Sequence, residues 1–162
     1  EMACGSQALA LLNAAFDQNR QVSQAFSAKI TETGEAARRM NELLSAQKYR
    51  MAGLEKRVFA GIAESYGNRG NVLHFEEGLS ADGVRELADA IADKCGGTAA
   101  VFSGSDGGGY AYCLIAHQGD LRQLGRDMTA ALHGRGGGKP LCQQGRVQAA
   151  KEEIEAFFAD RQ

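Results

Sequence analysis

Apolar residues recur at steps of three and four through the first 66 residues, and this period restricts that part of the chain to helix. A strand would instead alternate every two residues. Within this part, one stripe follows the alternating steps of four and three that form a coiled-coil seam. The predicted seam consists of Met40, Leu44, Gln47, Met51, Leu54 and Val58. We predict that these residues form a dimerisation interface, in which the polar Gln47 sets the register at some cost in stability.

Two helices are expected in this region, with a break over residues 29–34, where threonine and glycine interrupt the pattern. The first helix carries its own stripe, which includes Leu9, Leu12 and Phe16. Packing of the two helices on each other is an alternative explanation for both stripes. The turn-forming residues from Tyr66 to Asn71 then end the second helix. These observations predict a helical stalk over residues 1–66 and a second domain over residues 67–162.

The second domain shows short strands alternating with short helices, which is typical of an α+β or α/β unit. Strands are predicted over 72–75, 98–103 and 110–116, and helices over 80–94, 120–132 and 146–158. Ser80 is placed to cap the first of these helices. Only six residues separate the second and third strands, so they are expected to form an antiparallel hairpin. The predicted fold class is therefore α+β: a helical hairpin or coiled-coil stalk followed by a small mixed β-sheet with flanking helices.

Charge is unevenly distributed along the chain. The whole sequence has 18 Lys and Arg residues against 20 Asp and Glu residues, and its formal net charge of -2 argues against a broadly basic nucleic-acid binder. Residues 121–147 nevertheless form the one clear positive stretch, with Asp127 as its only acidic residue. Its basic residues are Arg122, Arg126, Arg135, Lys139 and Arg146. We predict that they contact phosphate groups.

The segment from His133 to Pro140 is expected to be a glycine-rich loop that contains Gly136, Gly137 and Gly138. Successive N–H groups of such a loop can cradle an anion. Alternatively, the glycines allow the backbone to pass close to a neighbouring element. The segment lacks the third glycine of a dinucleotide-binding motif, and Pro140 stands where a Walker loop needs Ser or Thr, so a nucleotide site is disfavoured.

The sequence offers little support for other chemistry. Its three histidines and four cysteines do not show the short spacing of a zinc site. Cys113 is interpreted as an inert thiol packed inside a strand, and Cys142 has no base near it in sequence. The scattered cysteines favour reduced thiols in a cytoplasmic protein. There is no apolar run of transmembrane length and no signal-peptide pattern. The chain also begins without an initiating Met, which is consistent with a segment of a longer protein.

One stretch resembles a known family. A helix, then Gly134–Pro140, then Gln143–Val147 and a closing amphipathic helix resemble the C-terminal DHH-associated domain of the alanyl-tRNA synthetase family. The preceding helices resemble the linker that joins this domain to the editing domain, and residues 1–5 resemble the end of that editing domain. Within the family, Cys4-Gly5 and the stretch Asn19–Ser23 are more similar to the long freestanding alanyl-tRNA editing proteins than to the synthetases.

The resemblance implies a non-catalytic module that binds tRNA, specifically tRNA(Ala), and promotes homodimerisation. Hydrolysis of mischarged tRNA in this family takes place at a zinc site in the editing domain, whose ligand motif is absent from this sequence. No cofactor is therefore expected in this chain, and the parent protein is expected to be an aminoacyl-tRNA deacylase or an alanyl-tRNA ligase. Two alternatives remain open: the substrate-binding domain of a DHH-type phosphoesterase, and a purely structural oligomerisation module.

Overall fold

The computed structural model describes residues 5–159. Two compact units divide between Ala52 and Gly53. The first contains helix α1 (Ser6–Ala25), the 3-10 turn η1 (Ile30–Glu32) and the beginning of α2 (Thr33–Glu64). The predicted break between two helices is confirmed. Asn19 of α1 anchors the break, because its amide donates to the Ile30 carbonyl at 3.0 Å and accepts from the Thr33 hydroxyl at 2.8 Å.

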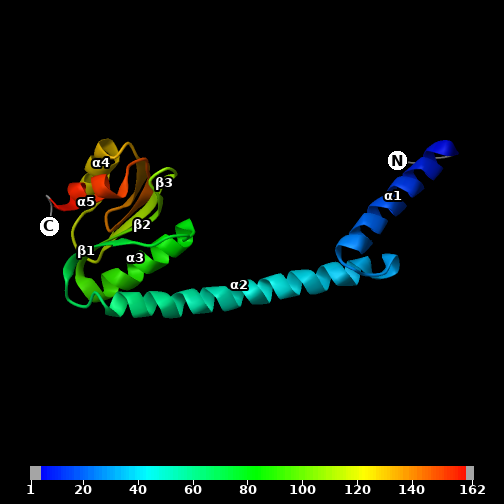
Figure 1. Ribbon diagram of the computed structural model, residues 1–162, viewed down its shortest axis with the longest axis horizontal. Helices are drawn as coiled ribbons and strands as arrows, with labels where there is room; N and C mark the ends of the chain where they lie inside the picture. Colours follow the sequence, from blue (N-terminus) through cyan, green and yellow to red (C-terminus); the bar gives the residue numbers. More distant parts are fainter. Residues whose placement is uncertain (1–4, 160–162) are drawn as a thin grey trace. The chain divides into compact units, whose positions relative to one another are not determined.

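The second unit is built on a five-stranded sheet of order β1-β2-β3-β5-β4 (Figure 1). Its strands are β1 (Gly70–Phe75), β2 (Gly96–Ser105), β3 (Gly109–Ala116), β4 (Arg135–Lys139) and β5 (Cys142–Val147). Its helices after α2 are α3 (Ala81–Cys95), α4 (Arg122–Ala131) and α5 (Lys151–Ala159). β1 pairs parallel with β2 through the crossover helix α3, and the remaining pairs are antiparallel. The predicted fold class is thus confirmed.

Helices cover both faces of this sheet. On one face α3 and the last turns of α2 bury a cluster that includes Phe59, Leu87 and Val101. Helices α4 and α5 lie on the other face (Figure 1). There they bury a second cluster around Phe102 and Met128. Since Phe59 and Ala63 lie in the first cluster, the end of α2 packs with the sheet. The division between the units therefore falls earlier than the expected boundary after residue 66.

Local signals for α3 and the β2–β3 hairpin agree with the structure. The Ser80 hydroxyl accepts a hydrogen bond from the Gly83 N–H at 3.1 Å and caps α3, as predicted. Gly96 follows the helix with a φ of 76°, a left-handed conformation that favours glycine at this end. The antiparallel pairing of β2 with β3 is also confirmed.

Two predictions about the glycine-rich region were wrong. Residues 135–139 are strand β4 rather than a loop, and they pair with β5 through a turn at Pro140 and Leu141. The last helix begins at Lys151 rather than at Arg146, because Arg146 and Val147 belong to β5. A strand with three successive glycines has no apolar alternation for a sequence pattern to detect. Its pairing with β5 defines it instead.

Candidate nucleic-acid interface

The β4–β5 hairpin places three of the predicted basic residues on one face of the sheet. Arg135 lies directly opposite Arg146, and Lys139 lies opposite Cys142. Because side chains alternate along a strand, Gly137 and Gln144 share this face. We call this set, Arg135, Gly137, Lys139, Gln144 and Arg146, the basic hairpin face.

The basic hairpin face is open to solvent. The register continues from β5 to Ala111, Cys113 and Ile115 of β3, on the side of the sheet that α3 covers. α3 packs on β1, β2 and β3, and its principal contacts do not extend to β4 or β5. Arg135, Lys139, Gln144 and Arg146 are accordingly all exposed. The outer part of this sheet face is thus an exposed polar surface.

Positive charge on this face has no acidic partner. Among residues 5–159, no carboxylate forms an ion pair with Arg135, Lys139 or Arg146. The Arg146 guanidinium donates to the Gly108 carbonyl at 2.8 Å, which fixes its position while leaving other donors available. Like charges directly opposite each other in a sheet are destabilising. An anionic ligand would relieve this repulsion between Arg135 and Arg146.

The neighbouring glycines serve close packing. A Cβ on Gly136 would collide with the Tyr112 hydroxyl and lie 2.5 Å from the Gln144 carbonyl oxygen. A Cβ on Gly138 would collide with the Cys142 carbonyl oxygen. Gly137, in contrast, has open space around the same position. The close-approach interpretation of the glycines is therefore supported at two of the three positions.

The extended conformation of β4 does not form the anion cradle expected of a loop. Successive N–H groups of a strand point in opposite directions, so they do not converge on one ligand. Those of β4 that face β5 are taken up by the sheet. The groups of this segment that can contact an anion are the side chains of Arg135 and Lys139. Gly136, Gly137 and Gly138 lie between them and add no side-chain bulk.

The other two predicted basic residues, Arg122 and Arg126, are not brought to this face. They lie on α4, which covers the opposite side of the sheet. Arg122 forms an ion pair with Asp120 at 2.6 Å, and this hydrogen-bonded partner holds the pKa of Asp120 at about 2. The Arg126 guanidinium donates to the Gln123 side chain at 2.7 Å. The structure thus divides the predicted set between two surfaces.

Gln144 is a site residue that the sequence reasoning missed. It is exposed between the two arginines and Lys139, where its amide can donate to or accept from a ligand. The signal that could have identified it is the two-residue spacing from Arg146. That spacing places both side chains on one face only if residues 142–147 are recognised as a strand.

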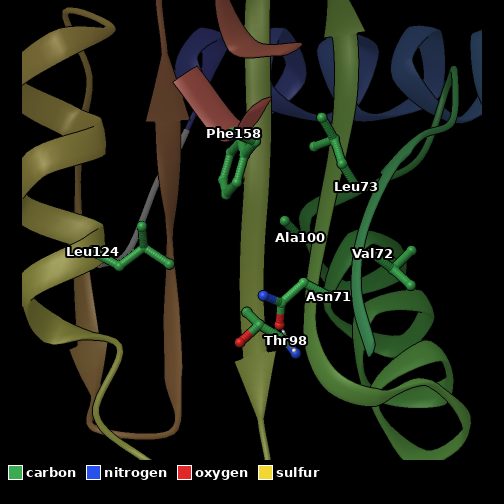
Figure 2. Close-up of a pocket in the computed structure, with 7 residues that line it drawn as sticks. All are labelled: Asn71, Val72, Leu73, Thr98, Ala100, Leu124 and Phe158. Atoms are coloured by element: carbon green, nitrogen blue, oxygen red, sulfur yellow. Dashed lines mark hydrogen bonds between the residues drawn. The ribbon is translucent and has the colours of Figure 1, made fainter. Parts of the chain in front are cut away.

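The cavity between the sheet and helices α4 and α5 does not provide a nucleotide site. Figure 2 shows side chains from β1, β2, α4 and α5 lining a small cavity, with Leu124 and Phe158 at its helical side. Its volume of about 50 Å³ accommodates water rather than a nucleobase. Within residues 5–159 there is no group of three or more His, Cys, Asp or Glu side chains that could hold a metal ion. No helix in the described part of the chain is long and apolar enough to cross a membrane.

The predicted seam of α2 is exposed. Met51 is 60% exposed, Leu54 51% and Val58 59%, and Met40 and Leu44 are also exposed. Gln47 lies among them with its side chain in solvent. α1 has no buried residue at all, although it carries Leu9, Leu12 and Phe16. The stripe of α1 is therefore not buried within a single chain.

Comparisons with known proteins give a likeness to solved structures. No protein-family model matches the chain, and no curated protein matches it. Among solved structures, the chain is similar to the C-Ala domain of alanyl-tRNA synthetase from Aquifex aeolicus. The sequences are 19% identical, the match covers 52% of this chain and 85% of that chain, and the TM-score is 0.44. A likeness at this level does not assign a function, which has to come from the charge and geometry of the interface.

Proposed function

We propose that this chain is an RNA-binding module that contacts the phosphate backbone through its basic hairpin face. The observation that carries the proposal is the cross-strand pair of Arg135 and Arg146, exposed and without an acidic partner. Lys139 lies four residues from Arg135, roughly 13 Å along the strand. Successive phosphates of a nucleic acid are closer together than this, so the face can contact more than one of them.

Folded RNA fits this face better than a flexible single strand. Binding of single strands relies on exposed aromatic rings on which bases stack. Neither strand of the hairpin carries an aromatic residue, and the nearby rings of Tyr112 and Phe102 are buried on the other side of the sheet. Arginine, lysine and glutamine can instead contact phosphates and 2′-hydroxyl groups, which is how folded RNA is recognised.

The specific RNA in this proposal is tRNA, with tRNA(Ala) as its first candidate. The basis is the resemblance of residues 134–147 to the DHH-associated domain of the alanyl-tRNA synthetase family. The residues 1–4 that also carried the resemblance to an editing protein lie outside the described part of the chain. In this proposal the chain is a non-catalytic cytoplasmic module. Hydrolysis of mischarged tRNA and its zinc ion belong to a separate editing domain of the parent protein.

A second copy of the chain is the proposed partner of α2. The apolar residues of its seam recur at alternating steps of four and three, a spacing that allows two identical helices to pack as a coiled coil. These residues are exposed in the single chain. A dimer would present two basic hairpin faces. Once one face has bound an RNA, the second face is held close to the same RNA. This raised effective concentration strengthens overall binding even if each contact is weak.

The proposal is tested by a salt titration of binding to a folded tRNA(Ala) transcript and to an unrelated tRNA. Wild type is compared with the double variant Arg135→Glu/Lys139→Glu. We expect the double variant to bind tRNA more weakly than wild type. The slope of log K against log salt concentration should be shallower by about 2, because two phosphate contacts are lost. Tighter binding of tRNA(Ala) than of the unrelated tRNA would support a specific role.

The matched comparison is Arg122→Glu/Arg126→Glu on α4. This variant tests the other two predicted phosphate contacts, which lie on the opposite side of the sheet. We expect a smaller effect, since Asp120 already neutralises Arg122. Equal losses in both double variants would indicate attraction by overall charge and would refute the basic hairpin face as the site. The same conclusion follows if the β4 variant binds as wild type does.

A further inference from the structure

Two cysteine side chains lie in contact across neighbouring strands. Cys113 of β3 and Cys142 of β5 occupy diagonal positions of the ladder, because Cys113 pairs with Gln144 and Ile115 pairs with Cys142. Both project to the face of the sheet that α3 covers. Their Sγ atoms are 4.0 Å apart.

The two thiols differ in accessibility. Cys113 is 1% exposed, and burial together with the neighbouring Cys142 raises its pKa, so it is a poor first nucleophile. Cys142 is only partly buried and borders an open depression that Arg85 and His117 line together with the acidic Glu86 and Asp89. It lies directly opposite Lys139. Cys142 is therefore the more accessible of the two thiols, and exposure is one condition for a cysteine to react.

We propose that Cys113 and Cys142 form a reversible disulfide, with Cys142 as the thiol that reacts first and hydrogen peroxide as the oxidant. The Cys142 thiolate attacks one peroxide oxygen, and the O–O bond breaks to give a sulfenic acid and hydroxide, which takes up the proton that the Cys142 thiol released and becomes water. The Cys113 sulfur then attacks the sulfenic sulfur. The S–S bond forms, the S–O bond breaks, and the hydroxyl leaves as water with the Cys113 proton. Two thiols lose two electrons, and one peroxide becomes two waters.

The hairpin position makes this closure feasible. A disulfide requires the sulfurs to approach from 4.0 Å to about 2 Å. Side-chain rotation supplies part of this movement, and a small shift of β5 supplies the rest. β5 lies between β3 and the five-residue edge strand β4, and β4 can move together with it because no further strand pairs beyond β4. A diagonal bond of this kind is strained, and strained disulfides are readily reduced.

Cys95 provides an internal comparison. It is also buried in the cluster beneath α3, but its Sγ contacts the Ala92 carbonyl at 3.9 Å and accepts from the Gly97 N–H at 3.4 Å. It makes no thiol contact among the described residues. If peroxide oxidised buried thiols only because the protein unfolds transiently, Cys95 would be oxidised as readily as Cys113.

The experiment uses the full chain with Cys4→Ser, since Cys4 lies outside the described residues. The reduced protein is treated with hydrogen peroxide, denatured and alkylated, and its intact mass and peptide map are recorded. We expect loss of two alkylatable thiols, together with a cross-linked peptide pair that joins Cys113 to Cys142. The reductant dithiothreitol should restore both thiols. The added variants Cys113→Ala and Cys142→Ser should abolish the cross-link, and Cys95→Ala should retain it.

The Cys113→Ala variant also assigns the order of the two steps. It should accumulate oxidised Cys142, which dimedone traps as the sulfenic acid, whereas Cys142→Ser should leave Cys113 reduced at the same peroxide dose. The proposal is overturned if the wild-type chain keeps both thiols under conditions that oxidise Cys142 in Cys113→Ala. It is also overturned if the cross-link involves Cys95.

Discussion

Gly136 and Gly137 are neighbours in β4, yet a methyl group would meet different surroundings at each. At Gly136 it would collide with the hydroxyl of Tyr112, a buried side chain whose hydroxyl has no hydrogen-bond partner. At Gly137 it would point into open space on the basic hairpin face. Counting glycines in the sequence could not separate these roles, because the difference arises from which side of the strand each one faces.

This difference predicts that Gly136→Ala is destabilising and Gly137→Ala is not. Overpacking at Gly136 is expected to lower the free energy of unfolding by about 1–3 kcal/mol. Gly137→Ala should change it by less than about 0.5 kcal/mol, as is usual at exposed positions. Urea denaturation followed by circular dichroism measures both. Equal destabilisation by the two substitutions would contradict the assigned faces of β4.

Among the elements, those with strong local signals were predicted correctly. α3 combines an N-terminal Ser80, a regular apolar face and a C-terminal glycine, and each of these signals acts locally. β4 and β5 lack such signals, since their residues are mostly glycine, glutamine and arginine. β4 depends on pairing with β5, and β5 depends on pairing with β3, which begins 33 residues before Cys142. Predicting the basic hairpin face therefore requires knowledge of the sheet register, which the sequence pattern does not contain.

The start of α5 depends on a carboxylate from another element. The Asp106 side chain, in the turn between β2 and β3, accepts hydrogen bonds from the Lys151 N–H at 2.8 Å and the Tyr110 hydroxyl at 2.9 Å. These two bonds hold the pKa of Asp106 below its usual value. The ionised form is thus favoured in the folded state, and the turn is tied to the helix.

This arrangement predicts a component of acid sensitivity that Asp106→Asn removes. Because the pKa is lower in the folded state, the stabilisation is complete above the unfolded value of 3.8 and is lost as pH falls through the lowered folded value. Thermal unfolding of the wild type and of Asp106→Asn between about pH 6 and pH 2 measures this loss of stability. The wild-type melting temperature should fall more steeply at the acid end. Parallel curves would show that Asp106 does not contribute.

At the scale of the whole molecule, the exposed seam of α2 predicts a dimer in solution. Light scattering should give twice the chain mass, and the melting temperature should rise with protein concentration. Leu44→Glu places a charge in the seam and should give the monomer mass. Gln47→Leu should instead raise the melting temperature, since it replaces the polar seam residue at a cost in register specificity. A monomeric wild-type chain with a concentration-independent melting temperature would contradict the proposed partner of α2.

Strand β4 also has a consequence for how the protein behaves in concentrated solution. It is the last strand of the sheet, so one of its edges has backbone groups free to pair with another chain. Arg135 and Lys139 occupy its two ends, and the glycines between them offer no apolar side chain to a second strand. A second β4 added antiparallel would bring an arginine opposite a lysine at both ends. The charges that attract an anion therefore also prevent the sheet from growing edge to edge into fibrillar aggregates.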